Sequence, residues 1–411
     1  MSKLCMFLIL IILKSTISAD VTRGVNLGGW LMLEPWITPS LFEQFRNTSF
    51  ENTAIDETTF NQRLGYQEAF KQLEKHWTEW VTEEDFMKIR DYGLDAVRIP
   101  FSWWIIHTGT GLVSGLHHLD RGVQLAKKYG LKVLLDLHGA PLSQNGFDNS
   151  GLTCTNFYRS GKCPTNCPDK LGWGQDADNN FESLRLTLET LKKITLRYKD
   201  QDHIYGIQLV NEPWLTIDID LLKNWYMEAY TELRSIAPKS WNIVMHDSFR
   251  QNQWQDFMLD KARYPNNIID SHIYFAFSQD IMKMKPEEIV KASCNVVDQV
   301  KLLKKSGQTV IIGEWSLGHD DCAQWLVGFR QNPVKTEILK LSCDEAFSDS
   351  DYSNFVRNQL WAWEQADGWF FWNFKNELED NWSYFKLVER GWVPKDARTF
   401  PEWVKGSMCN K

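Results

Sequence analysis

The chain has 411 residues, 43% of which are hydrophobic, and a formal net charge of −8 at pH 7. This length can form one large core or two smaller ones. The negative charge argues against nucleic acids and anionic membranes as partners.

Residues 1–19 have the features of a secretory signal peptide. Lys3 supplies a positive charge, Met6 to Leu13 form an apolar core, and Ile17-Ser18-Ala19 form a small-residue cleavage site. The apolar core is too short to span a bilayer, and no later stretch reaches about 18 apolar residues. We therefore expect residues 20–411 to be a single secreted domain that does not insert into membranes. An uncleaved signal anchor is the alternative.

Eight short apolar runs have the length of buried strands, and segments with helical periodicity separate them. The expected strands are Gly24–Leu27, Ala96–Pro100, Lys132–His138, Ile204–Asn211, Asn242–His246, Ile268–His272, Val310–Glu314 and Gly368–Asn373. One expected helix, Phe181 to Tyr198, carries leucines at helical spacing, and Pro286 begins another. This alternation predicts an α/β fold, a (β/α)8 TIM barrel, with a doubly wound open sheet as the alternative.

A barrel of this kind needs only about 250 residues, so the remaining residues must lie in insertions. We expect them at Trp30–Trp80, Gly139–Asn180 and Trp315–Ser350. All three follow the C-terminal ends of expected strands, the face that carries function in such barrels.

Two of the apolar runs end on a glutamate, Glu212 in Asn211-Glu212-Pro213 and Glu314 in Gly313-Glu314-Trp315. Either glutamate alone would be an ordinary surface group. Together, at matched strand ends, they are the pair that glycosidic bond cleavage requires, because one protonates the leaving oxygen and the other attacks the anomeric carbon. We expect the pair to lie about 5–5.5 Å apart, as in retaining enzymes. We also expect Glu314 to be ionised and Glu212 to be a protonated acid with a raised pKa.

Other polar and aromatic residues stand at the ends of the expected strands. Arg98 lies inside an apolar run, so it needs a buried partner, and an ionised Glu314 or a purely structural ion pair would provide one. Asn211 is placed to donate to a sugar 2-hydroxyl, and Tyr274 to donate to the nucleophile. His138, His272 and Trp372 complete the expected site. His107, His117 and His118 fall away from these strand ends, and we interpret them as surface residues. No pattern requires a metal or another cofactor.

Twenty tryptophans are several times the ordinary usage. Some must fill the core, but flat aromatic surfaces also stack on sugar rings. Asn47-Thr48-Ser49 and Asn381-Trp382-Ser383 match the N-glycosylation pattern.

With these residues in view, the chain from about Val21 to Cys409 resembles glycoside hydrolase family 5, and within it the fungal-type exo-β-1,3-glucanases. The matching segments are Arg23 to Trp30, Leu33-Glu34-Pro35, Asp136 to Pro141, Ser143 to Gly151, Asn211-Glu212-Pro213 and Gly313 to Ser316. Asn-Glu-Pro marks only the broad family. The Gln144–Gly151 string and the Leu27–Trp30 segment are more specific.

The resemblance implies that Glu212 is the acid/base and Glu314 the nucleophile of a secreted hydrolase of the extracellular space or cell wall. It also implies a glucose site formed by Arg98, His138, Asn211, His272, Tyr274 and Trp372. Glu34 and Asp148, with the neighbouring Asn149, would hold the distal hydroxyls and close the far end of the groove. Phe147 and Phe277 would clamp the next sugar. The resemblance further implies the disulfides Cys322–Cys343 and Cys294–Cys409, a β-glucan substrate and a monomer.

Two segments depart from the family pattern. The loop Leu152–Trp173, which contains Cys154, Cys163 and Cys167, is longer than usual, and Trp36 replaces a tyrosine. A local disulfide among these three cysteines is one interpretation, and a zinc site is the alternative. The alternatives for function are another linkage (β-1,6 or β-1,4), transglycosylation, and a non-catalytic glucan-binding protein.

Overall fold

The computed structural model describes residues 21–107, 109–153, 172–176, 178, 180–278, 280–326, 328–329 and 347–410. The signal segment lies outside these residues, as do Cys154, Cys163, Cys167 and Cys343. Among the described residues, no helix is long and apolar enough to cross a bilayer.

Eight parallel strands close into a barrel in chain order, each paired with its neighbours and β8 with β1. The strands are β1 (Thr22–Asn26), β2 (Ala96–Ser102), β3 (Lys132–Gly139), β4 (Ile204–Gln208), β5 (Asn242–His246), β6 (Asn267–His272), β7 (Val310–Trp315) and β8 (Gly368–Phe371). The predicted TIM barrel is confirmed, and the open-sheet alternative is excluded because the sheet has no free edge.

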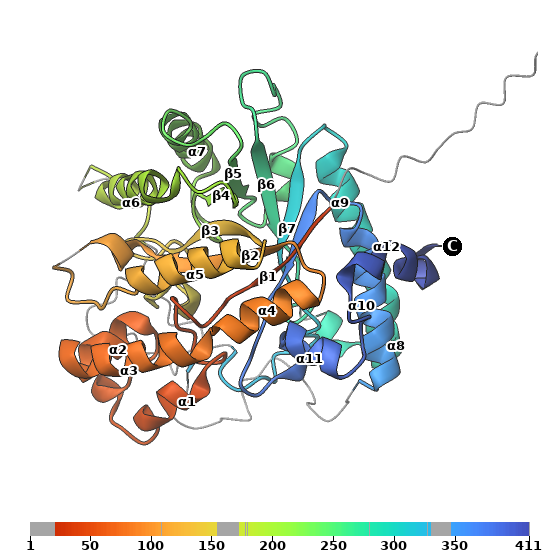
Figure 1. The fold of residues 1–411 in the computed structure, drawn as a ribbon, viewed down its shortest axis with the longest axis horizontal. Helices are drawn as coiled ribbons and strands as arrows, with labels where there is room; N and C mark the ends of the chain where they lie inside the picture. Colours follow the sequence, from red (N-terminus) through yellow and green to blue (C-terminus); the bar gives the residue numbers. More distant parts are fainter. Residues whose placement is uncertain are drawn as a thin grey trace, which may run out of the picture.

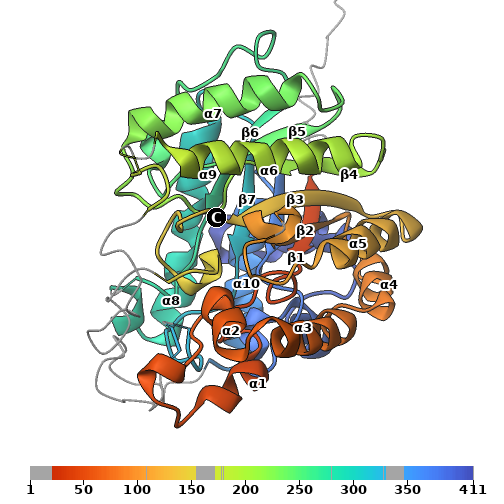
Figure 2. The same ribbon diagram turned by 90° about the vertical axis from the view of Figure 1, so that its left-hand side faces the viewer.

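Twelve α-helices surround or extend this barrel in the described part of the chain (Figures 1 and 2). They are α1 (Pro39–Phe42), α2 (Glu57–Leu64), α3 (Tyr66–Trp80), α4 (Glu83–Asp91), α5 (Leu116–Lys128), α6 (Glu182–Tyr198), α7 (Ile219–Arg234), α8 (Pro286–Ala292), α9 (Val296–Lys304), α10 (Asp349–Trp363), α11 (Tyr384–Glu389) and α12 (Phe400–Trp403). The helical periodicity is confirmed in α6, where Leu184, Leu191 and Ile194 are buried.

Two hydrophobic clusters hold the fold together. The large one contains most of the buried apolar side chains. The small one joins single residues from six strands: Ala96, Leu134, Val244, Ile268, Ile311 and Phe370. Gly24 of β1 is required beside it, because a Cβ there would lie 2.4 Å from the ring of Phe370.

Strand β4 ends at Gln208, three residues before the expected end. Beyond Gln208 the chain leaves the regular pairing of the sheet. Its backbone still makes two hydrogen bonds to neighbouring strands, from Leu209 N to Val244 O and from Asn211 N to Leu137 O. Glu212 then takes a positive φ of 44°, a conformation that non-glycine residues rarely adopt. The backbone turn, rather than a strand end, therefore directs the Glu212 side chain.

The first insertion carries α1, α2 and α3, which pack at one end of the barrel (Figure 1). Trp30 Nε1 donates to Trp77 O at 2.8 Å, and His76 Nε2 lies 2.6 Å from Gly29 O. These contacts attach α3 to the segment that follows β1. In the second and third insertions, residues 154–171, 177, 179, 327 and 330–346 lie outside the described residues.

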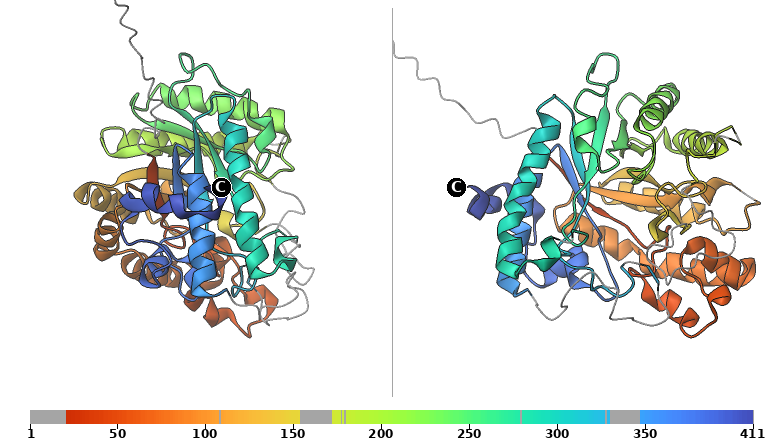
Figure 3. Two further views of the ribbon diagram at one scale, coloured as in Figure 1. Left: turned by 90° about the vertical axis from the view of Figure 1, so that its right-hand side faces the viewer. Right: turned by 180° about the vertical axis from the view of Figure 1, so that it is seen from behind.

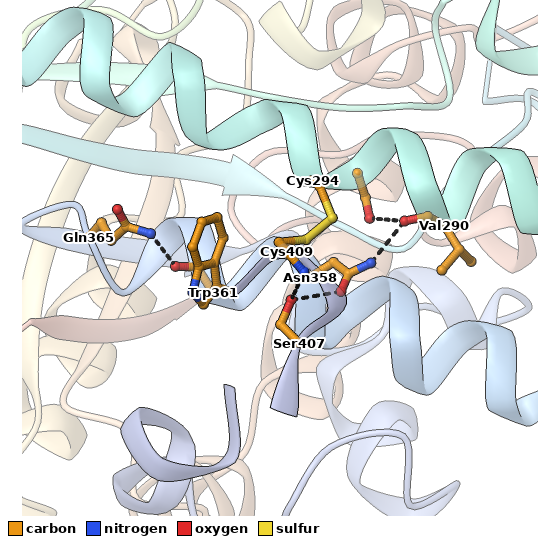
Figure 4. The surroundings of a disulfide bond; sticks show 8 residues. Val290, Cys294, Asn358, Trp361, Gln365, Ser407 and Cys409 are labelled. Carbon is orange, nitrogen blue, oxygen red and sulfur yellow. Dashed lines mark hydrogen bonds between the residues drawn. A yellow bond between two sulfur atoms is a disulfide. The ribbon is translucent and has the colours of Figure 1, made fainter. Parts of the chain in front are cut away.

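The C-terminal segment runs beside α9 and α10 (Figure 3). The disulfide Cys294–Cys409 joins it to the turn between α8 and α9 (Figure 4). Ser407 Oγ donates to Asn358 Oδ1 at 2.8 Å, and Asn358 Nδ2 donates to Val290 O at 2.8 Å. The expected Cys294–Cys409 pair is thus confirmed.

Glu57 of α2 holds the loop that carries Glu34. Its side chain is buried, and its Oε2 accepts from Leu33 N at 2.8 Å. Burial raises the pKa of the Glu57 carboxyl to about 8. In the unfolded chain this carboxyl titrates near its ordinary value of 4.5. The protonated carboxyl therefore makes its full contribution to the free energy of unfolding below pH 4.5. This contribution is lost as the pH rises towards 8.

Glu57→Gln keeps the acceptor oxygen but not the charge. We expect this variant to have a higher free energy of unfolding than the wild type above pH 8. The gain should be at least about 1.4 kcal/mol, the equivalent of one pKa unit. Urea unfolding at pH 4 and above pH 8 measures it. A difference of the same size at both pH values would contradict this origin.

Candidate active site

A buried guanidinium connects the C-terminal ends of four strands. Arg98 of β2 is completely buried. Its nitrogens lie 2.8 Å from Glu314 Oε1, 2.8 Å from Asn26 Oδ1, 2.8 Å from Asn211 Oδ1, 2.9 Å from Gln208 Oε1 and 3.1 Å from Asp136 Oδ2. A buried cation is tolerated only when it is paired and hydrogen-bonded. The partner that the sequence predicted, Glu314, is among these five.

Glu314 lies one residue before the end of β7 and is buried. Besides Arg98, the Tyr274 hydroxyl donates to its Oε2 at 2.8 Å. Burial raises the pKa of the Glu314 carboxyl above its ordinary value, although the positive charges of His272 and Arg98 act in the opposite direction. The pKa of Tyr274 lies well above its usual range because of burial and the charge of Glu314, so its hydroxyl remains a donor.

Glu212 receives two hydrogen-bonding contacts. His272 Nδ1 lies 2.8 Å from its Oε1, and Asn149 Nδ2 donates to its Oε2 at 3.0 Å. Burial raises the pKa of the Glu212 carboxyl, but the hydrogen bond and charge of His272 outweigh burial, so this pKa lies below its ordinary value. The expectation of a raised pKa at Glu212 is therefore wrong, because the sequence does not show that an imidazole lies against this carboxylate.

His272 lies between the two glutamates. Its Nδ1 is 2.8 Å from Glu212 Oε1 and 3.4 Å from Glu314 Oε2, and its Nε2 is 3.1 Å from Asp270 Oδ2. Burial lowers the pKa of His272, but the charges of Glu314 and Asp270 outweigh burial and raise it well above 6.5. The imidazole therefore carries a proton on both nitrogens and bridges three carboxylates.

This shared nitrogen limits the separation of the glutamates. Because both carboxylates contact Nδ1 of His272, their nearest oxygens are no farther apart than the sum of 2.8 and 3.4 Å. Both glutamates also line the same pocket, so the two carboxylates face one small region of it.

His138 and Trp372 form one wall of the site. Their rings are stacked, 5.3 Å apart and inclined by 9°. His138 Nδ1 lies 2.6 Å from Asp136 Oδ2, and its Nε2 lies 3.4 Å from Asn211 Nδ2. Asp136 therefore orients this imidazole and also contacts Arg98.

The two glutamates open into a pocket of about 330 Å³. Nine of the residues expected in the site line it: Glu34, Phe147, Asp148, Asn149, Glu212, Tyr274, Phe277, Glu314 and Trp372. The other four, Arg98, His138, Asn211 and His272, are buried beside the lining residues and hydrogen-bond to one another or to the glutamates. The structure thus brings the whole expected set together.

One part of the pocket is acidic. Burial raises the pKa of the Glu34 carboxyl well above its ordinary value, and the charge of Asp148 raises it further. Trp36 Nε1 donates to Glu34 Oε2 at 2.9 Å. A protonated Glu34 beside Asp148 offers a donor and acceptors to a polyhydroxylated ligand.

The rest of the lining is aromatic. Phe147 packs edge-on against Trp214, with ring centres 4.8 Å apart, and Trp214 packs against Phe249 at 5.6 Å. Phe277, of which 53% is exposed, lies 6.4 Å from Trp382. No sequence pattern points to Trp214, Phe249 or Trp382, because these residues follow the strands in segments without periodicity.

The sequence analysis also missed groups that support the site, namely Asp136, Gln208, His246 and Asp270. Gln208 Nε2 donates to Asp270 Oδ2 at 2.9 Å, and Asp270 contacts His272. His246 is buried with its ring 4.3 Å from that of His272. All four lie within the strands expected from the sequence. A polar side chain inside an apolar run is therefore the signal that could have identified them as supporting residues.

Glu212, His246 and His272 place potential metal ligands within 4.8 Å of one another. Both nitrogens of His272 face carboxylates, Glu212 at 2.8 Å and Asp270 at 3.1 Å. The described geometry is that of a hydrogen-bonded network.

The three histidines interpreted as surface residues differ from one another. His117 has an exposed side chain, and His107 is half-buried beside Thr190. His118 is 5% exposed, so the surface interpretation is wrong for this residue. It packs against Trp77 of α3, a contact that spacing along α5 does not reveal.

The chain is similar to known proteins over most of its length. The sequence model of the family described as cellulase (glycosyl hydrolase family 5) matches residues 57–377. A glucan 1,3-beta-glucosidase of Blumeria graminis is 38% identical over 413 residues, which cover 94% of this chain and 90% of that protein. A glucan 1,3-beta-glucosidase of Candida oleophila is 35% identical over 409 residues, with 93% and 91% covered.

Among solved structures, a rutinosidase from Aspergillus niger aligns with a TM-score of 0.67 at 18% sequence identity. The alignment covers 90% of this chain and 97% of that one. This likeness concerns the fold.

We expect Arg98→Met to lower the free energy of unfolding by about 3–5 kcal/mol, because it leaves Glu314 and Asp136 buried without their cation. The matched control is Arg197→Met, which breaks a pair with Asp120 whose side chains are 43% and 27% exposed. That change should cost less than about 1 kcal/mol. Urea unfolding at neutral pH measures both variants. Equal losses would show that Arg98 does not compensate buried charge.

Proposed function

Because this chain belongs to glycosyl hydrolase family 5, we propose that it is a retaining exo-β-1,3-glucanase that releases glucose from the non-reducing end of β-1,3-glucans. It is a glycoside hydrolase, and its substrate is a glucan. The observation that carries the retaining mechanism is the contact of Glu212 and Glu314 with the same nitrogen of His272.

The reaction takes place in two displacements. First, a carboxylate oxygen of Glu314 attacks the anomeric carbon, the bond to the leaving oxygen breaks, and Glu212 gives that oxygen a proton. A water molecule then attacks the same carbon and gives its proton to Glu212, and the glucosyl ester with Glu314 breaks. Two inversions leave the product with the β configuration of the substrate.

The hydrogen bond between His272 and Glu212 supplies the proton for the first displacement. At rest, His272 holds this proton at Nδ1, 2.8 Å from Glu212 Oε1. As negative charge develops on the leaving oxygen, this proton moves along the existing contact to Glu212, and Glu212 gives a proton to that oxygen. The proton that Glu212 takes from water in the second displacement then restores the proton on His272. This role explains how Glu212 acts as an acid although its pKa is lowered in the resting site.

Arg98 and Tyr274 support the nucleophile. Both donate to Glu314 at 2.8 Å, which favours the ionised carboxylate needed for attack. Arg98 also binds Oδ1 of Asn211, and this leaves the Asn211 amide directed as a donor towards a sugar 2-hydroxyl. Trp372, stacked on His138, gives the glucose an apolar floor.

We further propose that residues 1–19 are a signal peptide and that residues 20–411 act as a secreted, monomeric enzyme of the extracellular space or cell wall. Exposed Asn47 and half-buried Asn381 are the proposed N-glycosylation sites. Glucose release from laminarin, cellulose and pustulan, compared at equal enzyme concentration, tests the linkage. The proposal requires laminarin to be the preferred substrate.

The roles of the two glutamates separate in their variants. Glu314→Ala should abolish turnover of every substrate, because no covalent intermediate can form. Glu212→Ala should lose about 10²–10⁴-fold on laminarin, which needs a protonated leaving group, but much less on glycosylation by activated aryl β-glucosides. Kinetics on both substrate types measure this difference. Identical losses for the two variants on both substrates would contradict the assignment.

Exo action follows from the acidic end of the pocket. Glu34 and Asp148 would bind the distal hydroxyls of one glucose and block the groove beyond it. Phe147 and Phe277 would stack on the next sugar, each contributing about 0.5–1.5 kcal/mol by analogy with aromatic pairs. The earliest products on laminarin should therefore be glucose alone. A ladder of oligosaccharides before glucose would show an open groove.

A further inference from the structure

A second cluster of ligand-type side chains lies outside the pocket, where helix α3 meets helix α5. It consists of Glu74 on α3 and the adjacent His117 and His118 on α5, and we call it the α3–α5 cluster. Glu74 Oε1 lies 2.9 Å from His117 Nε2, and Glu74 Oε2 lies 3.3 Å from His118 Nε2. The three ligand atoms are within 4.8 Å of one another. None of these residues lines the catalytic pocket.

The polar contacts of the cluster run between its own members. Glu74 Oε1 is buried, and its contact is with His117 Nε2. The other nitrogen of His118, Nδ1, has no hydrogen-bond partner in the described part of the chain, so the polar contact of this imidazole is with Glu74. Both side chains therefore direct their polar groups into one small region.

The carboxylate of Glu74 faces imidazoles rather than a lysine or arginine. Within the described ranges, the ion pairs of Glu74 are with these two histidines alone. The guanidinium of Arg121 instead donates to the carbonyl oxygens of Trp77 and Val81.

We propose that the α3–α5 cluster binds Zn²⁺ through Glu74, His117 and His118. Zinc binds imidazole nitrogen and carboxylate oxygen at about 2.0–2.2 Å in tetrahedral geometry, which places neighbouring ligand atoms about 3.3 Å apart. Each imidazole lies near that spacing from one oxygen of the carboxylate, His117 Nε2 at 2.9 Å from Oε1 and His118 Nε2 at 3.3 Å from Oε2. The side chain of His117 is 59% exposed, so the ion can enter from solvent and keep a water molecule as its fourth ligand.

Such an ion would join two parts of the chain that are distant in sequence. Helix α3 belongs to the first insertion, and α5 belongs to the barrel, between β2 and β3. Zinc bound at the α3–α5 cluster would fasten the insertion that carries Glu34 to the barrel. It would stabilise the folded state by binding it in preference to the unfolded chain. This site is independent of the proposed function.

The test is a titration of the secreted, metal-stripped protein with Zn²⁺ in competition with a chromophoric chelator, together with thermal unfolding. The variants are His117→Ala and Glu74→Gln, both of which alter partly exposed side chains. His107→Ala is the control, because it removes a half-buried histidine that lies outside the cluster, beside Thr190. We expect one equivalent to bind the wild type and the control and to raise their melting temperatures. We expect at least 10-fold weaker binding and no thermal shift in the two cluster variants.

The activity of the same samples separates this site from the catalytic one. Zinc at the α3–α5 cluster leaves hydrolysis unchanged, whereas zinc at Glu212, His246 and His272 inhibits it. Absence of binding to the wild type would overturn the proposal. Binding of equal strength in wild type and His117→Ala would overturn it too.

Discussion

The burial of Arg98 is the constraint on which the active site depends. Its guanidinium is inaccessible to solvent, so the protein must supply the partners that water would otherwise provide. It does so from β1, β3, β4 and β7, and the ladder itself assists, since Asn26 stands opposite Arg98 in the β1–β2 register. A barrel delivers strand ends to one face, which lets a single cation hold all of these groups at once. The position of Glu314 follows from this arrangement.

The electrostatics of the site follow from placing several acids around few cations. Asp136, Asp270, Glu212 and Glu314 are buried together, and Arg98 and His272 are the cations that contact them. Glu314 has a raised pKa despite Arg98, whereas Glu212 has a lowered pKa because His272 lies against it. The site is therefore a network that shares protons. The roles of the glutamates are set by their contacts, with donors around Glu314 and a proton-bearing imidazole beside Glu212.

Much of this architecture could be predicted from the sequence. Apolar runs gave the eight strands, and the isolated charge of Arg98 gave its pairing with Glu314. The resemblance to a known family led to the Cys294–Cys409 disulfide. The predictions that failed concern groups brought together by the fold. No local pattern shows that His272 touches Glu212, that Trp77 covers His118, or that β4 ends before Asn211. Supporting residues such as Asp270 have the same origin, because their importance depends on neighbours distant in sequence.

The central claim is that Glu314 forms a covalent bond with the sugar while Glu212 manages the proton. Its most direct test is incubation with an activated 2-deoxy-2-fluoro-β-glucoside, which forms the glycosyl-enzyme quickly and hydrolyses slowly, followed by proteolysis and peptide mass spectrometry. The account predicts one fluoroglucosyl group, attached to Glu314, with no labelling of the Glu314→Ala variant. A label on Glu212 or another residue, or an enzyme that turns over glucans without ever becoming labelled, would contradict it.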